Sequence, residues 1–275
     1  MPIRLSLERP PLANFGTPPH PATYPQLQFM LLADDTAALF QTAADTTPVT
    51  TTGQFIGRWR SSFGSKSMIF DEATNLPTWK TLQLGTNSRA GVKFDGTNDK
   101  LVHTEADIFN THAEGDLFFA YQHAGTIGIP ASTMLLASAD TAVATKYLFV
   151  EAPMDGHYTL NARNAGAISE IAGDANVTID IISIVNIRSN GSRYKLYYDG
   201  VQDGNDASAG NNGLWFSGVS DRDNISLGAR VDNIPDGFAN MYLGCVLYFY
   251  PKLPDLHRKL VTQWLMDYYN QVQLP

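Results

Sequence analysis

The chain has 275 residues, a formal net charge of −8 and a pI near 5.1. Binding to a phosphate backbone needs clustered Lys and Arg, so this acidic balance argues against nucleic acid and anionic membrane as partners. With 44% hydrophobic residues, a chain of this length is expected to form one main domain. The single cysteine, Cys245, lies in an apolar run, which predicts a buried thiol and excludes a disulfide within one chain.

The first 26 residues are rich in proline and predict an extended arm. Proline fixes φ and lacks an N–H group, so such a stretch is polyproline-like and does not fit inside a sheet. Apolar side chains between the prolines predict docking onto a neighbouring subunit, with a trimer as the first expectation: Leu5, Leu7, Leu12, Phe15 and Tyr24. The alternative is a disordered leader. No apolar segment of signal-peptide length is present near Met1, so export by the ordinary secretory route is not expected.

From residue 27 onward, short apolar segments alternate with Gly, Asn, Asp and Thr, the pattern of an all-β domain spanning 27–275. The strongest hairpin signal joins 181–188 to 193–198 through Asn190 and Gly191. Asp199 and Gly200 predict the next turn. The other strands are expected at 91–95, 117–121, 133–137, 147–150, 225–229 and 242–250, antiparallel because no helical crossovers separate them.

One helix is predicted, at 254–269. Its apolar residues recur at helical spacing and are expected to pack on the sandwich: Leu256, Leu260, Trp264 and Tyr268, with Val261 and Leu265 alongside. Pro254 suits the first turn, and Asp255 complements the positive end of the helix dipole.

Three stretches together resemble laminin-G-like, concanavalin A-like domains of phage virion and bacterial surface proteins. They are 48–60 (Pro-Val-Thr-Thr-Thr-Gly-Gln-Phe-Ile-Gly-Arg-Trp-Arg), 92–101 (Val-Lys-Phe-Asp-Gly-Thr-Asn-Asp-Lys-Leu), and the 244–250 strand followed by the helix. The resemblance covers about residues 30–275. It implies a two-sheet antiparallel jelly-roll sandwich with a C-terminal helix.

The resemblance also implies a role. The expected function is a non-catalytic structural or adhesion module on the surface, tail or capsid of a phage-like particle. The partners would then be other particle proteins, reached through the arm, and a host-surface glycan. A soluble carbohydrate-binding lectin or a glycoside hydrolase is the alternative, because this fold carries all of these functions.

The hypothesis of glycosidase activity depends on Glu105, Asp107 and Asn110. They resemble the Glu-x-Asp-x-x-Glu signature of jelly-roll β-glucanases except at the last residue. Retaining hydrolysis needs two carboxyl groups, one as nucleophile and one as acid/base. Asn110 cannot donate and regain that proton. The sequence therefore predicts no catalytic residue and no enzyme activity.

No cofactor is predicted, with calcium left open on fold analogy. Four carboxylates lie in loops rich in hard oxygen ligands: Asp199, Asp203, Asp221 and Asp223. The alternative is that these residues serve only the turns, which favour Asp, Asn and Gly. His103, His112 and His123 share a region but lack metal-ligand spacing.

The predicted glycan-binding residues are Trp215, Asn212 and Arg163. Trp215 closes a loop of small residues, and its indole offers a stacking face for a sugar. Asn212 and Arg163 supply hydrogen-bonding groups for hydroxyls. The alternative for Trp215 is an anchor in the interior of the sandwich.

Overall fold

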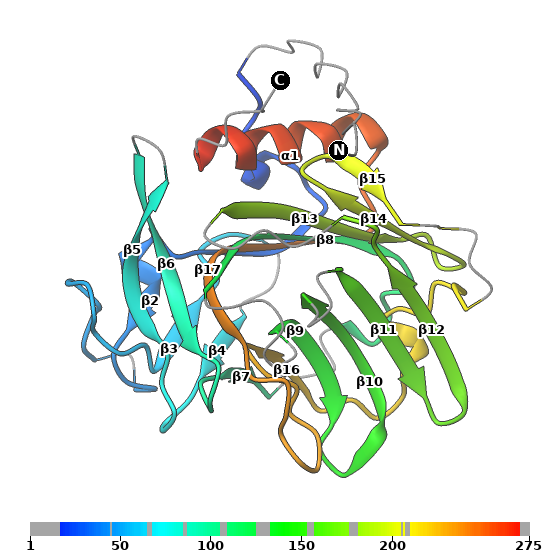
Figure 1. The fold of residues 1–275 in the computed structure, drawn as a ribbon, viewed down its shortest axis with the longest axis horizontal. Helices are drawn as coiled ribbons and strands as arrows, with labels where there is room; N and C mark the ends of the chain where they lie inside the picture. Colours follow the sequence, from blue (N-terminus) through cyan, green and yellow to red (C-terminus); the bar gives the residue numbers. More distant parts are fainter. Residues whose placement is uncertain are drawn as a thin grey trace, which may run out of the picture.

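The computed structural model describes residues 17–44, 46–64, 68–84, 87–104, 109–124, 133–152, 157–175, 181–204, 206 and 210–269, with the backbone alone at 82–84 and 87–88. Within these residues the chain folds into two antiparallel β-sheets with one α-helix on top (Figure 1). The two-sheet antiparallel sandwich predicted from the sequence is confirmed.

Sheet A carries the helix. Its strand order is β15-β14-β13-β8-β17-β6-β5, with β1 paired to the second half of β17. The strands are β1 (Leu27–Leu32), β5 (Thr78–Leu84), β6 (Asn87–Asp95), β8 (Gly115–His123), β13 (Ile182–Ser189), β14 (Tyr194–Tyr198), β15 (Val201–Asp203) and β17 (Asn240–Phe249).

Sheet B forms the opposite layer, in the order β12-β11-β10-β9-β16-β7-β4-β3-β2. Its strands are β2 (Leu39–Phe40), β3 (Arg58–Arg60), β4 (Ile69–Asp71), β7 (Leu101–His103), β9 (Thr133–Asp140), β10 (Val143–Ala152), β11 (Thr159–Asn164), β12 (Ala167–Ala172) and β16 (Asn224–Leu227). Three short 3₁₀ helices lie in the described connections, at Pro21–Thr23, Thr36–Ala38 and Phe216–Gly218.

The predicted hairpin is confirmed as β13 and β14, which pair from Val185↔Tyr198 to Ser189↔Tyr194. Asn190 Oδ1 accepts hydrogen bonds from the backbone N–H groups of Ser192 and Arg193, and Gly191 has a φ of 82°. A φ this positive suits glycine, so the Asn-Gly pair fixes the turn and with it the register.

The main core lies between the sheets and is built from alternate residues of both. Along β10, for example, Leu148 and Val150 point into it, while Tyr147 and Phe149 occupy the opposite face. Each sheet therefore buries one face, and the two outer faces meet different surroundings.

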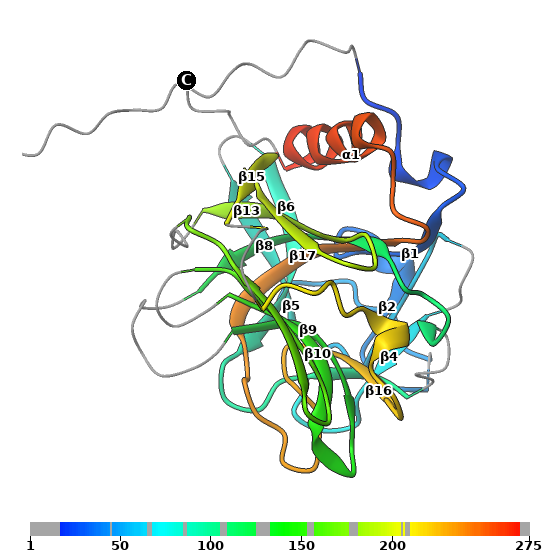
Figure 2. The ribbon, with the colours of Figure 1, turned by 90° about the vertical axis from the view of Figure 1, so that its right-hand side faces the viewer.

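The outer face of sheet A is covered by α1 (Asp255–Tyr268), as Figure 2 shows. Val261, Leu265 and Met266 are buried against Phe118, Ile184 and Leu247 in a second apolar cluster that also contains Cys245, and burial raises the pKa of its thiol well above the usual range. Within the described residues, no helix is both long and apolar enough to cross a membrane.

The buried stripe of α1 differs from the predicted one. Leu256 is 50% exposed, and Trp264 and Tyr268 are half-buried, whereas Arg258 and Thr262 are buried. The guanidinium of Arg258 lies 3.6 Å from the ring centre of Tyr197. This cation–π contact explains why Arg258 is buried, although the spacing of the apolar residues predicts that it lies on the solvent-exposed side of the helix.

The described part of the predicted arm, residues 17–26, packs on its own chain. Tyr24 is 7% exposed, with its ring centre 6.4 Å from that of Phe249 and 4.9 Å from that of His257. The prediction that Tyr24 contacts a neighbouring subunit is therefore wrong, because its ring completes the cluster beneath α1. The other predicted arm residues, Leu5, Leu7, Leu12 and Phe15, lie outside the described residues.

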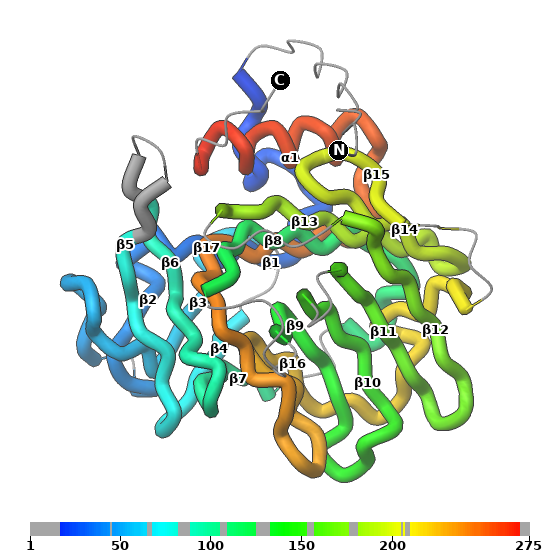
Figure 3. Tube along the Cα trace, viewed as in Figure 1, coloured from blue at the N-terminus to red at the C-terminus, as the bar shows by residue number. Residues whose placement is uncertain are grey.

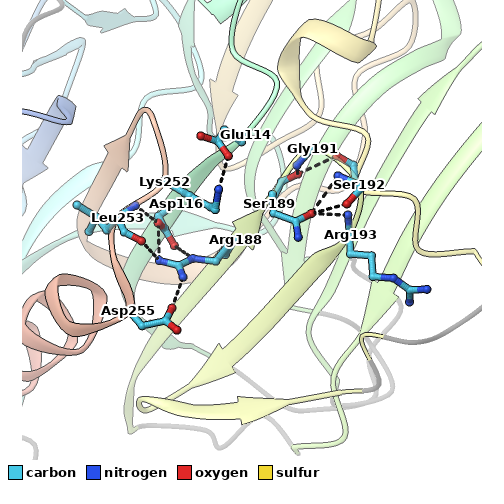
Figure 4. Close-up of polar contacts among 12 residues, drawn as sticks. Glu114, Asp116, Arg188, Ser189, Gly191, Ser192, Arg193, Lys252, Leu253 and Asp255 are labelled. Carbon is cyan, nitrogen blue, oxygen red and sulfur yellow. Dashed lines mark hydrogen bonds and ion pairs between the residues drawn. The ribbon is translucent and has the colours of Figure 1, made fainter.

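A buried ion pair ties the start of α1 to sheet A (Figure 4). Arg188 donates from Nε to Asp116 Oδ1 at 2.8 Å and from Nη2 to Asp116 Oδ2 at 3.0 Å. Its other contacts are the carbonyl of Leu253 at 2.6 Å and the carboxylate of Asp255 at 2.5 Å. Asp116 also accepts a hydrogen bond from the N–H of Leu253, so the ion pair holds the backbone immediately before α1 against sheet A.

Candidate functional site

Among the residues that the structure describes, no helix lies over the outer face of sheet B, and only part of this face is covered. The segment 228–239 folds over β16 and β9, where Asn224 Nδ2 donates to the Val231 carbonyl at 2.7 Å and Ser226 Oγ to the Ala229 carbonyl at 2.6 Å. Ala137 and Ala139 of β9 are fully buried as a result. On the neighbouring strands β10, β11 and β12, the side chains of this face are exposed or half-buried, except for Phe149, which is buried.

The strand registers place these side chains in rows. Tyr147 of β10 lies opposite Arg163 of β11, which lies opposite Ile168 of β12. In the next row, Phe149, Asn161 and Glu170 align in the same way, and Glu151 aligns with Thr159. We call this surface the open face; its residues are Tyr147, Phe149, Glu151, Thr159, Asn161, Arg163, Ile168 and Glu170.

Two polar groups on the open face are buried and have no hydrogen-bond partner among the described residues. They are Asn161 Oδ1 and Arg163 Nε. Asn161 is otherwise held in place, because its Nδ2 donates to Glu170 Oε2 at 2.9 Å. A buried polar atom without a partner costs about 1–3 kcal/mol, so both atoms favour a bound molecule that supplies the missing hydrogen bonds.

An aromatic pair adjoins these polar groups. The rings of Tyr147 and Phe149 stack with centres 5.0 Å apart and planes inclined by 29°. Arg230, from the covering segment, lies 4.9 Å from the centre of the first ring and 5.6 Å from that of the second. Arg230 in turn pairs with Asp232 at 3.2 Å and with Asp236 at 2.6 Å.

Asn212 lies at the far edge of the open face. The segment 210–212 runs along β12, where Glu170 N–H donates to the Gly210 carbonyl at 3.2 Å. Asn212 is exposed, and its Nδ2 donates to the Ile168 carbonyl at 3.4 Å. Asn212 therefore borders the row that contains Ile168 and Arg163, so two of the three predicted glycan-binding residues lie on or beside one surface.

Trp215 does not belong to this surface, and the prediction that it binds a ligand is wrong. Its side chain is 1% exposed within the core between the sheets. The indole Nε1 donates to the hydroxyl of Tyr248 at 3.3 Å, and the ring packs on Tyr194 and Phe216. The indole is buried because it is large and apolar and because the Tyr248 hydroxyl accepts the hydrogen bond from its N–H group inside the core.

The four carboxylates considered for calcium hold turns together separately. Asp199 accepts from Ile184 N–H, and Asp203 accepts from the N–H groups of Asp174 and Ala175. Asp221 pairs with Lys146, and Asp223 accepts from Thr141 N–H. Among the described residues, no group of three His, Cys, Asp or Glu side chains is arranged to hold a metal ion.

The residues considered for catalysis give no acid/base pair in the described structure. Asn110 Oδ1 accepts from Arg222 Nη2 at 2.9 Å, a contact that suits an amide in a structural role. Glu105 and Asp107 lie outside the described residues. His103 and His112 are buried in separate contacts, with the Ile69 carbonyl and the Tyr248 hydroxyl.

Asp99, at the turn after β6, gives a pH-dependent prediction. Burial, and then the negative charge of Asp95, raise the pKa of its carboxyl to about 6. The folded state therefore holds this proton more tightly than the unfolded chain does. The contribution of Asp99 to the free energy of unfolding is thus most favourable at low pH and is lost as the pH rises from about 4 to 6. Replacing Asp99 with Asn keeps an acceptor for Asp95 N–H, which Asp99 Oδ2 now binds at 2.9 Å.

We expect Asp99→Asn to raise the free energy of unfolding at pH 7.5, by up to about 3 kcal/mol at roughly 1.4 kcal/mol per pKa unit. Urea unfolding at pH 4.5, 6 and 7.5 measures this, with exposed Asp174→Asn as the control. A gain of equal size at pH 4.5 would show that charge is not the cause.

Comparison with known proteins supports the fold. No protein-family model matches the chain, and no curated protein matches it. Among solved structures, Trypanosoma rangeli sialidase is similar with a TM-score of 0.57 and 14% identity, over 93% of this chain and 36% of that one. The Ruminococcus gnavus IT-sialidase CBM40, bound to alpha2,3 sialyllactose, has a TM-score of 0.49 and 16% identity, over 67% and 97%. The likeness to the trypanosomal sialidase concerns the fold alone, and the chain spans about a third of the length of that protein.

Proposed function

We propose that this protein is a lectin-like module that binds carbohydrate on the open face of sheet B. One observation carries the proposal: beside the ring of Tyr147, Asn161 Oδ1 and Arg163 Nε are buried without a hydrogen-bond partner in the part of the chain that the structure describes. The outer face of sheet A, by contrast, is covered by α1 and lined by apolar side chains. We therefore place the ligand surface on sheet B, whose outer face carries polar side chains.

The chemistry of the open face suits a sugar. A hydroxyl group both donates and accepts, so Arg163 can donate to it while Asn161 Oδ1 accepts from it. Tyr147 is half-buried beside Phe149 and Arg230, and the accessible part of its aromatic ring can contact the weakly positive C–H groups of a pyranose. These side chains project from strands rather than loops, so the ligand would meet a site formed in advance.

Arg163→Ala and Asn161→Ala are expected to weaken glycan binding by tenfold or more each, equivalent to at least about 1.4 kcal/mol. Each removes one of the two polar groups that lack a hydrogen-bond partner among the described residues. A glycan array followed by calorimetric titration measures the effect. Lys259→Ala, on the exposed side of α1, is the control and should bind like the parent. Unchanged affinity in both open-face variants would contradict the proposal.

We also propose that the module is non-catalytic, on the evidence that Asn110 replaces the third carboxylate of the β-glucanase pattern and pairs with Arg222. Assays on β-glucans and on sialosides test this. Hydrolysis by the parent that disappears in Glu105→Gln would overturn it.

The particle role is the finer part of the proposal: adhesion on the surface of a phage-like particle, in an oligomer joined through the N-terminal arm. Its support is the resemblance in sequence and the apolar residues among the prolines of 1–16. Light scattering on the full chain and on a chain beginning at Thr17 tests the oligomer. Equal masses for the two would remove the arm from that role.

A further inference from the structure

We propose that the open face takes a neutral oligosaccharide laid across strands β10, β11 and β12, and that Asn212 contacts its outer end. This inference rests on the proposed carbohydrate binding and adds the direction, the length and the charge of the ligand. Its basis is the asymmetry of the face, which is closed at β9 and open at β12.

Arg230 closes the first end. Its guanidinium covers Tyr147 and Phe149 from the β9 side, at 4.9 and 5.6 Å from the ring centres. It is fixed there by Asp232, whose side chain is 2% exposed, and by Asp236. Beneath it, Ala137 and Ala139 are fully buried. A ligand that stacks on Tyr147 therefore cannot continue toward β9.

No described residue covers the second end in this way. Ile168 is 51% exposed, and Glu170 and Asn212 are exposed too. Neighbouring strands lie about 4.8 Å apart, so the three steps from β10 through β11 and β12 to the segment 210–212 span roughly 14 Å. That length exceeds a single sugar ring. A chain of sugars with one residue on Tyr147 and the next beside Arg163 reaches Asn212 at its other end.

The charges on the open face favour a neutral ligand. Three carboxylates on and beside this face, those of Glu170, Asp232 and Asp236, outnumber its two arginines, Arg163 and Arg230. A carboxylate on the sugar would be repelled by these groups, in a protein whose net charge is already −8. Hydroxyl groups instead satisfy both the acceptors and the donors present.

The experiment is a calorimetric titration with galactose, lactose and sialyllactose, and with glucose, cellobiose and cellotetraose. The expected result is that affinity rises with length in at least one neutral series, and that lactose binds at least as well as sialyllactose. Asn212→Ala should weaken the longest neutral sugar by about fivefold to tenfold and leave the monosaccharide of that series unchanged, whereas Arg163→Ala should weaken both.

Two further variants make the outcome decisive. Asn212→Asp keeps the acceptor that receives Leu214 N–H at 3.2 Å, but it replaces the amide donor with a carboxylate oxygen and adds a negative charge. With a neutral sugar it should therefore behave like Asn212→Ala if the turn is intact. Asn98→Ala, in the exposed turn after β6, is the control. Affinity independent of length, no effect of Asn212, or a preference for sialyllactose would overturn this inference while leaving carbohydrate binding in place. No binding to any of the six sugars would contradict the proposed function itself.

Discussion

Replacing Arg188 with Ala is expected to lower the free energy of unfolding by about 3–5 kcal/mol, the cost of removing one partner from a buried ion pair. The side chain of Asp116 is 0% exposed, so the substitution would leave its carboxyl group buried without the two hydrogen bonds from the guanidinium. The midpoint of urea unfolding, with an unchanged slope, measures this loss.

Two comparisons isolate the cause of that loss. Arg193→Ala removes an arginine from the same hairpin whose only described side-chain contact is with the Asp206 carbonyl, so its effect should stay within about 1 kcal/mol. The double variant Arg188→Met with Asp116→Leu removes both charges and should recover part of the stability. Recovery stays partial because Leu253 N–H loses its acceptor and Asn186 Nδ2 keeps only the Leu117 carbonyl. A double variant as unstable as Arg188→Ala alone would mean that packing, not the unpaired charge, sets the cost.

The strands that could be predicted from the sequence are those whose signals are local. β13 and β14 combine apolar alternation with an Asn-Gly turn, and β17 is a continuous apolar run, so no distant contact is needed to recognise them. β11 and β12 were not predicted, although Leu160 and Ala162 alternate with polar residues and Ala165-Gly166 forms their turn. The polar residues in this pattern are those of the open face, which weakened the apolar signal.

The helix shows the same limit. Its position and approximate ends follow from periodicity and from Pro254, but its rotation depends on what it covers. Residues four apart lie on one side of a helix, and two such rows were available, one through Leu256 and Leu260 and one through Val261 and Leu265. The second row faces Ile184 and Leu247, and Arg258 joins it through Tyr197. These partners lie on other strands, so the sequence of the helix alone does not choose between the rows.

For the candidate site, residue type alone identified Arg163 and Asn212 but did not separate Trp215 from them. The burial of Trp215 depends on Tyr248, which lies 33 residues further along the chain and supplies the acceptor for the indole. Tyr147, Asn161 and Glu170 carry no motif; only the pairing of β10, β11 and β12 places them beside Arg163.

Trp215→Ala is expected to cost about 3–5 kcal/mol of unfolding free energy, in the range for deleting a fully buried large aromatic side chain. The change removes the indole from its contacts with Tyr194 and Phe216 and takes the Nε1 donor from the Tyr248 hydroxyl. That hydroxyl stays protonated, because burial raises the pKa of Tyr248 well above its ordinary value, and it retains its contact with His112 Nδ1 at 3.0 Å. Trp215→Phe, which keeps a ring in the cavity, should lose less.

Trp215→Ala and Arg163→Ala, measured together, distinguish an effect on the stability of the core from an effect on glycan binding. Under conditions where Trp215→Ala remains folded, its affinity for glycans should match that of the parent, since no atom of the indole reaches the open face. Arg163→Ala should show the reverse, a loss of affinity with a nearly unchanged unfolding midpoint, because its guanidinium has no described partner to lose. If Trp215→Ala instead lost binding while its urea midpoint stayed at the parental value, the indole would be a ligand contact and the assignment of the site to β10, β11 and β12 would be wrong.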